Sequence, residues 1–515
     1  MPRLLPLSCG PGWWSPSVPL SLRRTVARTT VFGICISRWL LQPPRRKHQF
    51  TGLEREAWHH LTSRFPAVAQ GSAQLAEMLS AEELAHLLSA DQLNTPSELF
   101  VWQCALHWVQ HRPAERARHL PVLLAAVRLH HMDRRAFFRQ VAKNPLVVAD
   151  SLCQPAVSAA SEFFYRRNAG LARAVEPRLP HQVMFVVGGW TDQGPTTHVE
   201  TYDTKANEWQ QVLVEEEAGP KVYHATAVLG HCIYVIGGFG SDEYYSTCQS
   251  FHVVTKTWAD LSPMNARRYY LASAVLGNDI YAIGGLDGVR RHRSVEKYNP
   301  YDNQWRFVAS MNSKRSDAGA TEFNGKIYVV GGFDGFECVK SAEVYDPDAD
   351  QWTFIRPMIS RRSGITCVVY HGYIYTAGGY NGSAFLSCCE RFNPVTNSWT
   401  SGHNMRSRRG NLALGVVNDK IYAIGGSGGN YIMKTVEHFD DSTNEWLPAA
   451  DLRVARYGTS AIVVEDIPNV LDYVKRKLAV PRVQAREKIG SSSCAATQTD
   501  RSHHLNTSDS EDEEV

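Results

Sequence analysis

Basic residues recur at a fixed interval of 47 in the second half of the chain, and they are the first candidates for chemistry. The six positions are Lys221, Arg268, Arg315, Arg362, Arg409 and Arg456. An arginine side chain holds a carboxylate with two parallel hydrogen bonds, so a ring of such bases predicts a site for an acidic ligand. The alternative is architectural, because an arginine repeated in every unit can bond loop carbonyls between units.

Residues close to these bases that differ from one repeat to the next are better candidates for recognising a partner. They follow a base, follow a Gly-Gly pair, or lie in one arginine-rich loop. Together with Arg409, the candidate partner-binding residues are Trp190, Phe239, Tyr269, Arg290, Arg291, Arg293, Ser316, Phe333, Ser363, Tyr380 and Tyr457. Aromatic and basic side chains on one surface favour a protein ligand with an acidic motif.

Motifs for catalysis are weak. Residues Gly425 to Gly429 spell Gly-x-Ser-x-Gly around Ser427, but the pattern predicts no helix after it, and a nucleophile elbow requires one. The Gly-Gly pairs lack the helix that a phosphate-binding loop needs, and no Walker or zincin motif occurs. We therefore expect neither an enzyme nor a bound cofactor or metal.

The bases are positioned by a longer repeat. Gly-Gly pairs begin at Gly188, Gly237, Gly284, Gly331, Gly378 and Gly425. An aromatic residue follows each pair at a constant distance: Tyr202, Phe251, Tyr298, Tyr345, Phe392 and Phe439. A tryptophan then follows each aromatic residue: Trp209, Trp258, Trp305, Trp352, Trp399 and Trp446. A period in the forties with these markers predicts a six-bladed β-propeller over residues 182–466.

Each repeat reads as four strands, with the large rings packed between the outer parts of the blades. The first repeat starts at its second strand, residues 182–187, and the last strand, residues 457–464, is left over at the far end. We expect the leftover strand to pair with the first and close the ring, which removes the open sheet edges. The start of each inner strand and the end of each second strand should then meet at one mouth of the channel.

Residues 50–170 have a helical period instead. Ser80 and Glu83 form a predicted capping box, and Thr95 with Glu98 a second one, with Pro96 at the first helical position. Apolar stripes at three-four spacing follow each cap. A helical bundle is therefore predicted, joined to the propeller by a linker at residues 171–181.

A family resemblance appears in the helical region. The stretches from Leu79 to Leu84, from Asp91 to Asn94 and from Val127 to Leu129 resemble the BACK domain of the kelch-like family. The resemblance covers about residues 55–466 and implies an all-α BACK bundle followed by a kelch propeller. It also implies a substrate adaptor of a cullin-3 ubiquitin ligase. In that family, substrate contacts fall on the residue after the repeated base, on the aromatic after Gly-Gly, and on an arginine matching Arg291.

The family order is BTB, BACK, kelch, and a BTB domain is a complete α/β fold. Residues 1–49 carry eight basic residues and no Asp or Glu, and such a leader cannot supply that fold. Cullin-3 thus remains a possible partner through the helical bundle, whereas a BTB-mediated dimer is not expected. An Arg-rich leader without acids also has the composition of a mitochondrial transit peptide, which is the alternative for this segment.

Bulk properties limit the remaining classes. The net charge of +3 is too small to argue for a nucleic-acid or membrane surface. The eleven cysteines are odd in number and scattered, which indicates reduced thiols and a cytoplasmic protein. Residues 467–515 end in an acidic Ser/Thr-rich stretch that predicts a disordered tail.

Two functions remain open at this stage. The first is a non-catalytic substrate receptor of a cullin-3-type ligase that binds its target at the propeller face. The second is a kelch scaffold or cytoskeleton-binding protein that recruits no ligase.

Overall fold

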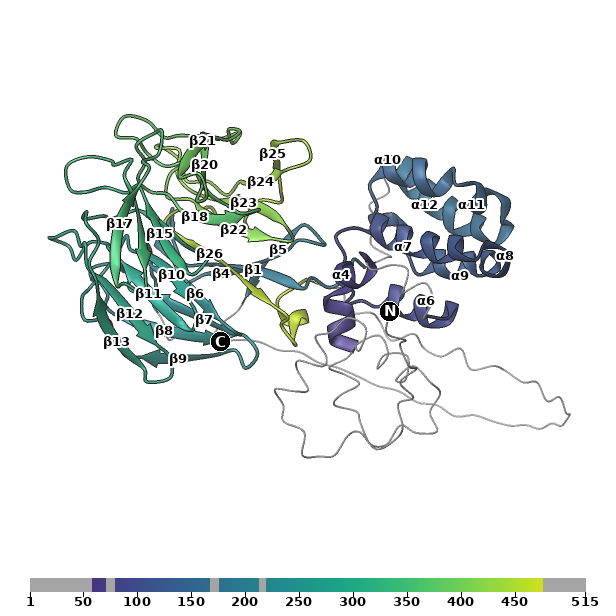
Figure 1. The fold of residues 1–515 in the computed structure, drawn as a ribbon, viewed down its shortest axis with the longest axis horizontal. Helices are drawn as coiled ribbons and strands as arrows, with labels where there is room; N and C mark the ends of the chain where they lie inside the picture. Colours follow the sequence, from purple (N-terminus) through teal and green to yellow (C-terminus); the bar gives the residue numbers. More distant parts are fainter. Residues whose placement is uncertain (1–57, 71–78, 167–175, 213–218, 476–515) are drawn as a thin grey trace, which may run out of the picture. The chain divides into compact units, whose positions relative to one another are not determined.

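The computed structural model describes residues 58–70, 79–166, 176–212 and 219–475. Helices make up the first part of the described chain and strands the second, in agreement with the change of period in the sequence (Figure 1). The sequence therefore predicted the fold class correctly: an all-α domain followed by an all-β propeller.

The helical domain contains short helices that share one core. Its elements are α4 (Phe65–Gln70), α6 (Ala81–Ser89), α7 (Glu98–His111), α8 (Pro113–Arg116), η1 (Ala117–His119), α9 (Leu120–Ala125), η2 (Leu129–His131), α10 (Arg134–Ala136), η3 (Phe137–Ala142), α11 (Pro145–Ala149), η4 (Ser151–Cys153) and α12 (Gln154–Arg166). The apolar stripes of α6, α7 and α9 meet in this core, where Leu84, Trp102 and Leu123 have no exposed surface. Such packing supplies most of the stability of helices this short.

One predicted cap is confirmed and the other is wrong. Ser80 caps α6, accepting from the Glu83 backbone N–H, while the Glu83 carboxylate accepts from the Ser80 N–H. In α7 the cap is Ser97, whose Oγ accepts from the Phe100 N–H, so the helix begins two residues later than predicted. Thr95 and Pro96 precede this helix, because Ser97 offers a hydroxyl directly before the apolar run.

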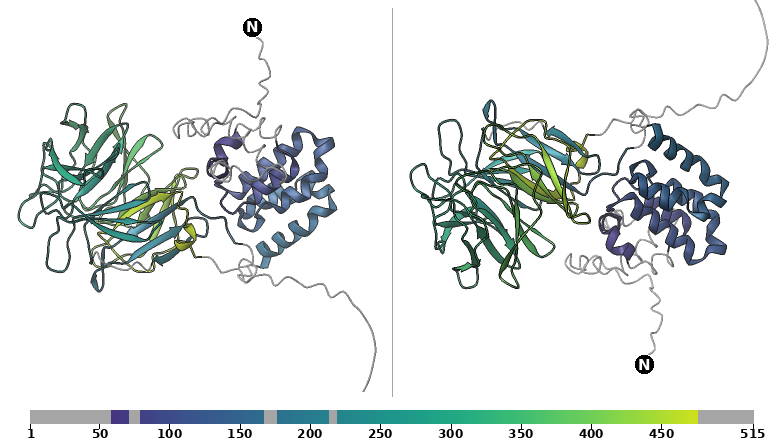
Figure 2. Two further views of the ribbon diagram at one scale, coloured as in Figure 1. Left: turned by 90° about the horizontal axis from the view of Figure 1, so that it is seen from below. Right: turned by 90° about the horizontal axis from the view of Figure 1, so that it is seen from above.

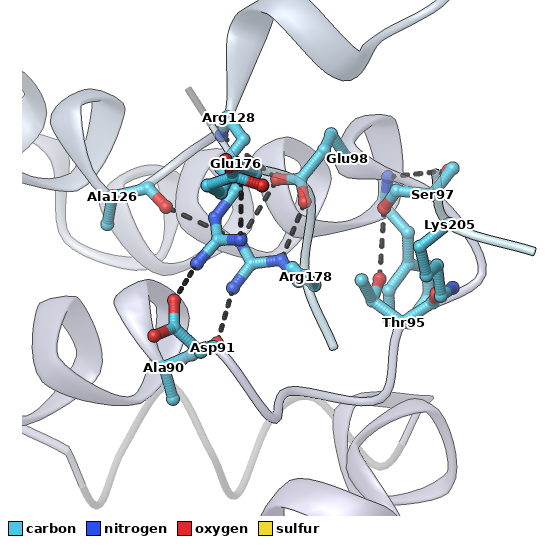
Figure 3. A network of polar contacts seen from close by, with 11 residues as sticks. Ala90, Asp91, Thr95, Ser97, Glu98, Ala126, Arg128, Glu176, Arg178 and Lys205 are labelled. Atoms are coloured by element: carbon cyan, nitrogen blue, oxygen red, sulfur yellow. Dashed lines mark hydrogen bonds and ion pairs between the residues drawn. The ribbon is translucent and has the colours of Figure 1, made fainter. Parts of the chain in front are cut away.

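The chain that follows the helices is anchored to the helical domain by Arg178 (Figure 3). Its buried guanidinium binds the Glu98 carboxylate at 2.6 and 3.0 Å and donates to the Ala90 carbonyl. Arg128 donates to Asp91 and, through its backbone N–H, to Glu98. Glu98 thus accepts from both arginines, and the last residues of the predicted linker form part of the helical domain.

The propeller has six four-stranded antiparallel sheets, in which neighbouring strands follow one another in the chain. The blades are β26, β1, β4, β5 (Ser460–Glu465, Gln182–Val187, Val199–Asp203, Glu208–Val212); β6 to β9 (Ala225–Leu229, Cys232–Ile236, Cys248–His252, Thr257–Leu261); β10 to β13 (Ala272–Leu276, Asp279–Ile283, Val295–Asn299, Gln304–Val308); β14 to β17 (Gly319–Phe323, Lys326–Val330, Ala342–Asp346, Gln351–Ile355); β18 to β21 (Cys367–Tyr370, Tyr373–Ala377, Cys389–Asn393, Ser398–Ser401); and β22 to β25 (Ala413–Val417, Lys420–Ile424, Val436–Asp440, Glu445–Pro448). We number the blades one to six in this order. A short pair, β2 (Trp190–Thr191) and β3 (Gly194–Pro195), lies in the loop after β1.

The ring closes as the sequence predicted. The last strand, β26, pairs antiparallel with β1 over six residues, from Gln182 opposite Glu465 to Val187 opposite Ser460. Figures 1 and 2 show this yellow strand beside the blue strand of the first blade. Residues 467–475, the start of the predicted tail, are described after β26, and Tyr473 packs on Phe185 with ring centroids 5.1 Å apart.

The repeated rings act as structural wedges, as the sequence indicated. All six aromatic markers are buried, and so are five of the six tryptophans. Each of these five donates its indole N–H to a backbone carbonyl that follows the outer strand of the preceding blade, for example Trp305 to Ser262 at 2.9 Å. Trp258 of blade two is half-buried, and the segment that would supply the equivalent carbonyl, after the outer strand of blade one, lies outside the described residues.

Candidate functional site

The candidate residues meet at one end of the propeller, which we call the mouth. There the residue after each repeated base forms an isolated β-bridge with the residue after the Gly-Gly pair of the same blade. The six pairs are Tyr457 with Trp190, Val222 with Phe239, Tyr269 with Leu286, Ser316 with Phe333, Ser363 with Tyr380, and Gly410 with Ser427. The expectation that these two sets of positions share one end of the blades is therefore met.

The six repeated bases are not part of this surface. Each is buried, and in five blades the arginine forms an ion pair with a buried glutamate. In blade three, Arg268 binds Glu296 at 2.9 Å and also donates to the Gly284 and Ser294 carbonyls. These contacts occupy the hydrogen-bond donors of the Arg268 guanidinium. The repeated bases therefore have the architectural role that the sequence left open as the alternative.

Arg409 requires a correction, because it was a candidate for partner binding. Its side chain has no exposed surface and donates to Glu437, to the Gly425 and Thr435 carbonyls and to the Thr435 hydroxyl. The position repeats in five blades as a buried arginine, and the spacing of the bases, considered without the glutamate 28 residues after Arg409, did not reveal that the two charges pair. Arg409 therefore cannot reach a partner in this structure.

Arg291 lies at the centre of the polar part of the mouth. Its guanidinium carbon stands 4.5 Å above the centroid of the Phe333 ring, and its Nε donates to Ser316 Oγ at 3.0 Å. Ser316 in turn donates to Asp317 Oδ2 at 2.8 Å. The structure thus brings three predicted residues together, although Ser316 itself is almost fully buried and acts through its neighbours.

The aromatic part of the mouth lies at blades one to three. Tyr269 stacks on Tyr244 with ring centroids 4.7 Å apart, and Phe239 lies 5.4 Å from Tyr244. Trp190 and Tyr457 are bridged to each other and partly exposed. These rings form a partly exposed apolar wall beside the polar residues around Arg291.

The other candidates lie farther apart. Tyr380 packs on Phe385 at 5.2 Å and is bridged to Ser363, whose hydroxyl is 3.3 Å from the Cys338 sulfur. Arg290 and Arg293 are exposed on the loop that carries Arg291. No contact joins either side chain to another candidate among the described residues.

Sequence reasoning missed a second ring at the mouth. The residue two positions after each base has a left-handed backbone, and the six residues donate backbone hydrogen bonds to one another in a closed circle of 2.9 to 3.0 Å. They are Tyr223, Tyr270, Asp317, Gly364, Asn411 and Gly458. Four of the six are Gly, Asn or Asp, the types that adopt positive φ most easily, and this pattern was the available signal.

This ring surrounds the axis. It lines a small cavity of about 80 Å³, beyond which the inner strands enclose a channel of about 360 Å³. Tyr223 and Tyr270 lie with ring centroids 3.9 Å apart on one side, and Asp317 and Asn411 belong to the same rim. Burial raises the pKa of the Asp317 carboxyl to about 7, although the Ser316 hydroxyl and Arg291 oppose the shift.

Three further observations concern membrane spans, metal sites and the Gly-x-Ser-x-Gly motif. None of the described helices is long and apolar enough to cross a membrane. Within the described ranges, His, Cys, Asp and Glu side chains form no group that could hold a metal ion. Ser427 lies in the loop between β23 and β24, where its Oγ accepts from the Gly429 N–H.

Three family models match the chain. The model described as "BTB And C-terminal Kelch" (BACK) matches residues 46–142, and "KLHDC2/KLHL20/DRC7 Kelch-repeats domain" matches residues 179–360. The model described as "Kelch motif" matches residues 361–406 and 408–453. The BACK match thus falls on the helical domain, and the kelch matches fall on the propeller.

One known protein gives the same indication. Kelch-like protein 30 of Mus musculus is 31% identical over 227 residues, which cover 41% of this chain and 37% of that protein. The solved structure titled "Structure of YjhT" has 17% identity and a TM-score of 0.44, and the match covers 48% of this chain and 88% of that one. The second similarity is too low to add to the fold described above. The BACK and kelch-repeat matches in succession, with the similarity to a kelch-like protein, support the prediction that the chain is a member of the kelch-like family.

Proposed function

We propose that this chain is a non-catalytic substrate receptor of a cullin-3-type ubiquitin ligase and that it binds its target protein at the mouth of the propeller. The observation that carries the proposal is the convergence of non-repeating side chains there. Arg291, Phe333, Tyr269 and Tyr380 are partly exposed, whereas the repeated residues around them are buried. Side chains that the fold itself does not require are the ones available for recognition.

The charge of the loops supports an acidic motif in the target. With the six repeated bases buried, the attraction for carboxylates comes from exposed bases in the mouth loops, which outnumber the exposed acids there. The bases include Arg267, Arg290, Arg293, Lys314, Arg408 and Arg453, and the acids are Asp192, Asp242, Glu243, Glu337 and Asp451. The turns at the opposite ends of the strands, with the strand residues beside them, carry more acids than bases. The acids are Glu208, Asp279, Asp302, Asp346, Asp348, Asp350, Asp419, Asp440, Asp441 and Glu445, and the bases include Lys205, Lys256, Lys326 and Lys420. An acidic ligand is therefore attracted to the mouth and repelled at the other end.

The helical domain supports the ligase part of the proposal through its family match. BACK and kelch repeats in one chain are typical of kelch-like adaptors, and such propellers generally bind proteins. The competing function is a scaffold that binds a partner at the same mouth without recruiting a ligase. The family match favours the adaptor, and cytoplasmic location is proposed with it.

Two experiments test the two parts separately. Tagged chain, alone and fused behind a BTB domain, is purified from cells and examined for cullin-3. We expect cullin-3 to be recovered with the fusion at least, and its absence from both preparations would leave only the scaffold function.

Proximity labelling with wild type and with the Arg291→Glu/Tyr380→Ala variant tests the mouth, with Arg306→Glu on an exposed outer strand as the control. The mouth variant should lose specific neighbours, and an unchanged set would place the binding face elsewhere.

A further inference from the structure

Asp317 holds a carboxylate at the axis of the mouth. It belongs to the ring of left-handed residues, and its backbone is held on both sides, by donation to Tyr270 and by acceptance from Gly364. Ser316 donates to Oδ2 at 2.8 Å, but none of the described residues donates to Oδ1. The residue also lines the small axial cavity. One carboxylate oxygen is therefore left for a group that enters from outside.

The neighbours of this oxygen suit a cation. Tyr270 and Tyr223 form part of the cavity wall, and the π-face of a tyrosine attracts a positive charge. Asn411 lies on the same rim, and no hydrogen bond uses its side-chain amide among the described residues. A carboxylate, an aromatic wall and a free amide together match the ammonium of lysine or the guanidinium of arginine.

We propose that Asp317 binds a lysine or arginine side chain of the partner protein at the axis of the propeller, an inference that rests on the proposed function. The target motif then carries both charges: an acid that binds near Arg291 and Arg290, and a base that enters between Asp317 and Tyr270. Arg291 and Asp317 are joined through the Ser316 hydroxyl, so the two halves of the motif meet one connected pair of charges.

The pairing gives the site a pH dependence of known sign. The charged and titratable groups that face Asp317 are Arg291, from the loop between β11 and β12, and the phenols of Tyr269 and Tyr270. Both phenols are neutral between pH 6 and pH 8, because burial raises their pKa values. A basic ligand needs the ionised carboxylate, so its affinity should rise by about tenfold from pH 6 to pH 8. A purely acidic ligand at Arg291 should instead weaken over the same range, because an ionised Asp317 repels it.

The test uses the full chain and a random 12-residue peptide library displayed on phage. Peptides are selected on wild type and counter-selected on the Arg291→Glu/Tyr380→Ala variant, so that only ligands of the mouth remain. Dissociation constants are then measured at pH 6 and pH 8 for wild type and Asp317→Asn. Asparagine occupies the same ring position at Asn411 with a φ of 50°, so this variant keeps the backbone. Asp334→Asn, on a mouth loop outside the ring, is the matched control.

The selected peptides should share a lysine or arginine. Its replacement by alanine and the Asp317→Asn change should each weaken binding by at least tenfold and abolish the rise with pH, while Asp334→Asn has no effect. Peptides of the mouth that lack a base, or that bind Asp317→Asn equally well, would overturn the inference and leave the proposed function intact. Failure to select any peptide dependent on the mouth would count against both.

Discussion

Blades two and three differ in how they bury their repeated base, although they follow the same pattern. In blade three, Arg268 is paired with Glu296, which also accepts from the backbone N–H groups of Asn265 and Ala266. In blade two, Lys221 donates to the neutral side chains of Gln249 and Thr247. Blade three therefore buries a neutralised pair, whereas blade two buries a cation with no carboxylate in contact.

The surroundings of Lys221 show the consequence. Burial lowers the pKa of its ammonium to about 8. The neighbouring His224, where blade three has Leu271, is buried with no partner for either ring nitrogen among the described residues. Burial, with Lys221 nearby, lowers the pKa of His224 to about 3, so the ring is neutral. The repeat thus preserves the shape of the blade while its electrostatic balance varies from blade to blade.

The largest expected effect comes from removing the base in each blade. Arg268→Met leaves Glu296 buried without its counter-charge and should destabilise the chain by about 3–5 kcal/mol. Lys221→Met leaves only the neutral Gln249 and Thr247 and should cost about 1 kcal/mol or less. The free energy of unfolding in urea measures both. Equal costs would show that the glutamate contributes nothing that a glutamine does not.

This contrast also shows what the sequence could and could not predict. The repeated rings and the closing strand were predicted because six copies of one environment make the pattern visible. The burial of Arg409 was not, although Glu296, Glu343, Glu390 and Glu437 follow their arginines at a constant spacing that could have revealed the pairing. A search for opposite charges at a constant spacing in the repeats would have predicted that these arginines are buried in ion pairs and do not bind a ligand.

The sequence predicted where the mouth lies, but it did not predict how the side chains there pack. The register placed Tyr269, Ser316 and Phe333 at one end of the blades, because antiparallel strands bring these positions together. It could not show that Ser316 is covered while Arg291 stacks on Phe333, since this depends on side-chain packing in three dimensions. Asp317 was missed because its role depends on a backbone circle around the axis.

A smaller effect, of opposite sign, should follow from giving blade two a carboxylate. Gln249 donates to Asp260 at 2.8 Å, so Gln249→Glu is combined with Asp260→Asn, which restores a donor. The new pair with Lys221 should stabilise the chain by about 1–2 kcal/mol at pH 7. Asp260→Asn alone is the control. Destabilisation by the double variant relative to that control would mean that the cost of burying a second charge exceeds the gain from pairing.

The pH dependence of stability should reveal Lys221 directly. Its pKa of about 8 in the folded chain lies below its ordinary value of 10.5, so between these values the unfolded chain binds a proton that the folded chain has released. Wild type should therefore gain stability relative to Lys221→Met as the pH rises from 8 to 10, by about 1 kcal/mol per pH unit. Urea unfolding at three pH values measures the difference. A constant difference would place the lysine pKa outside this window.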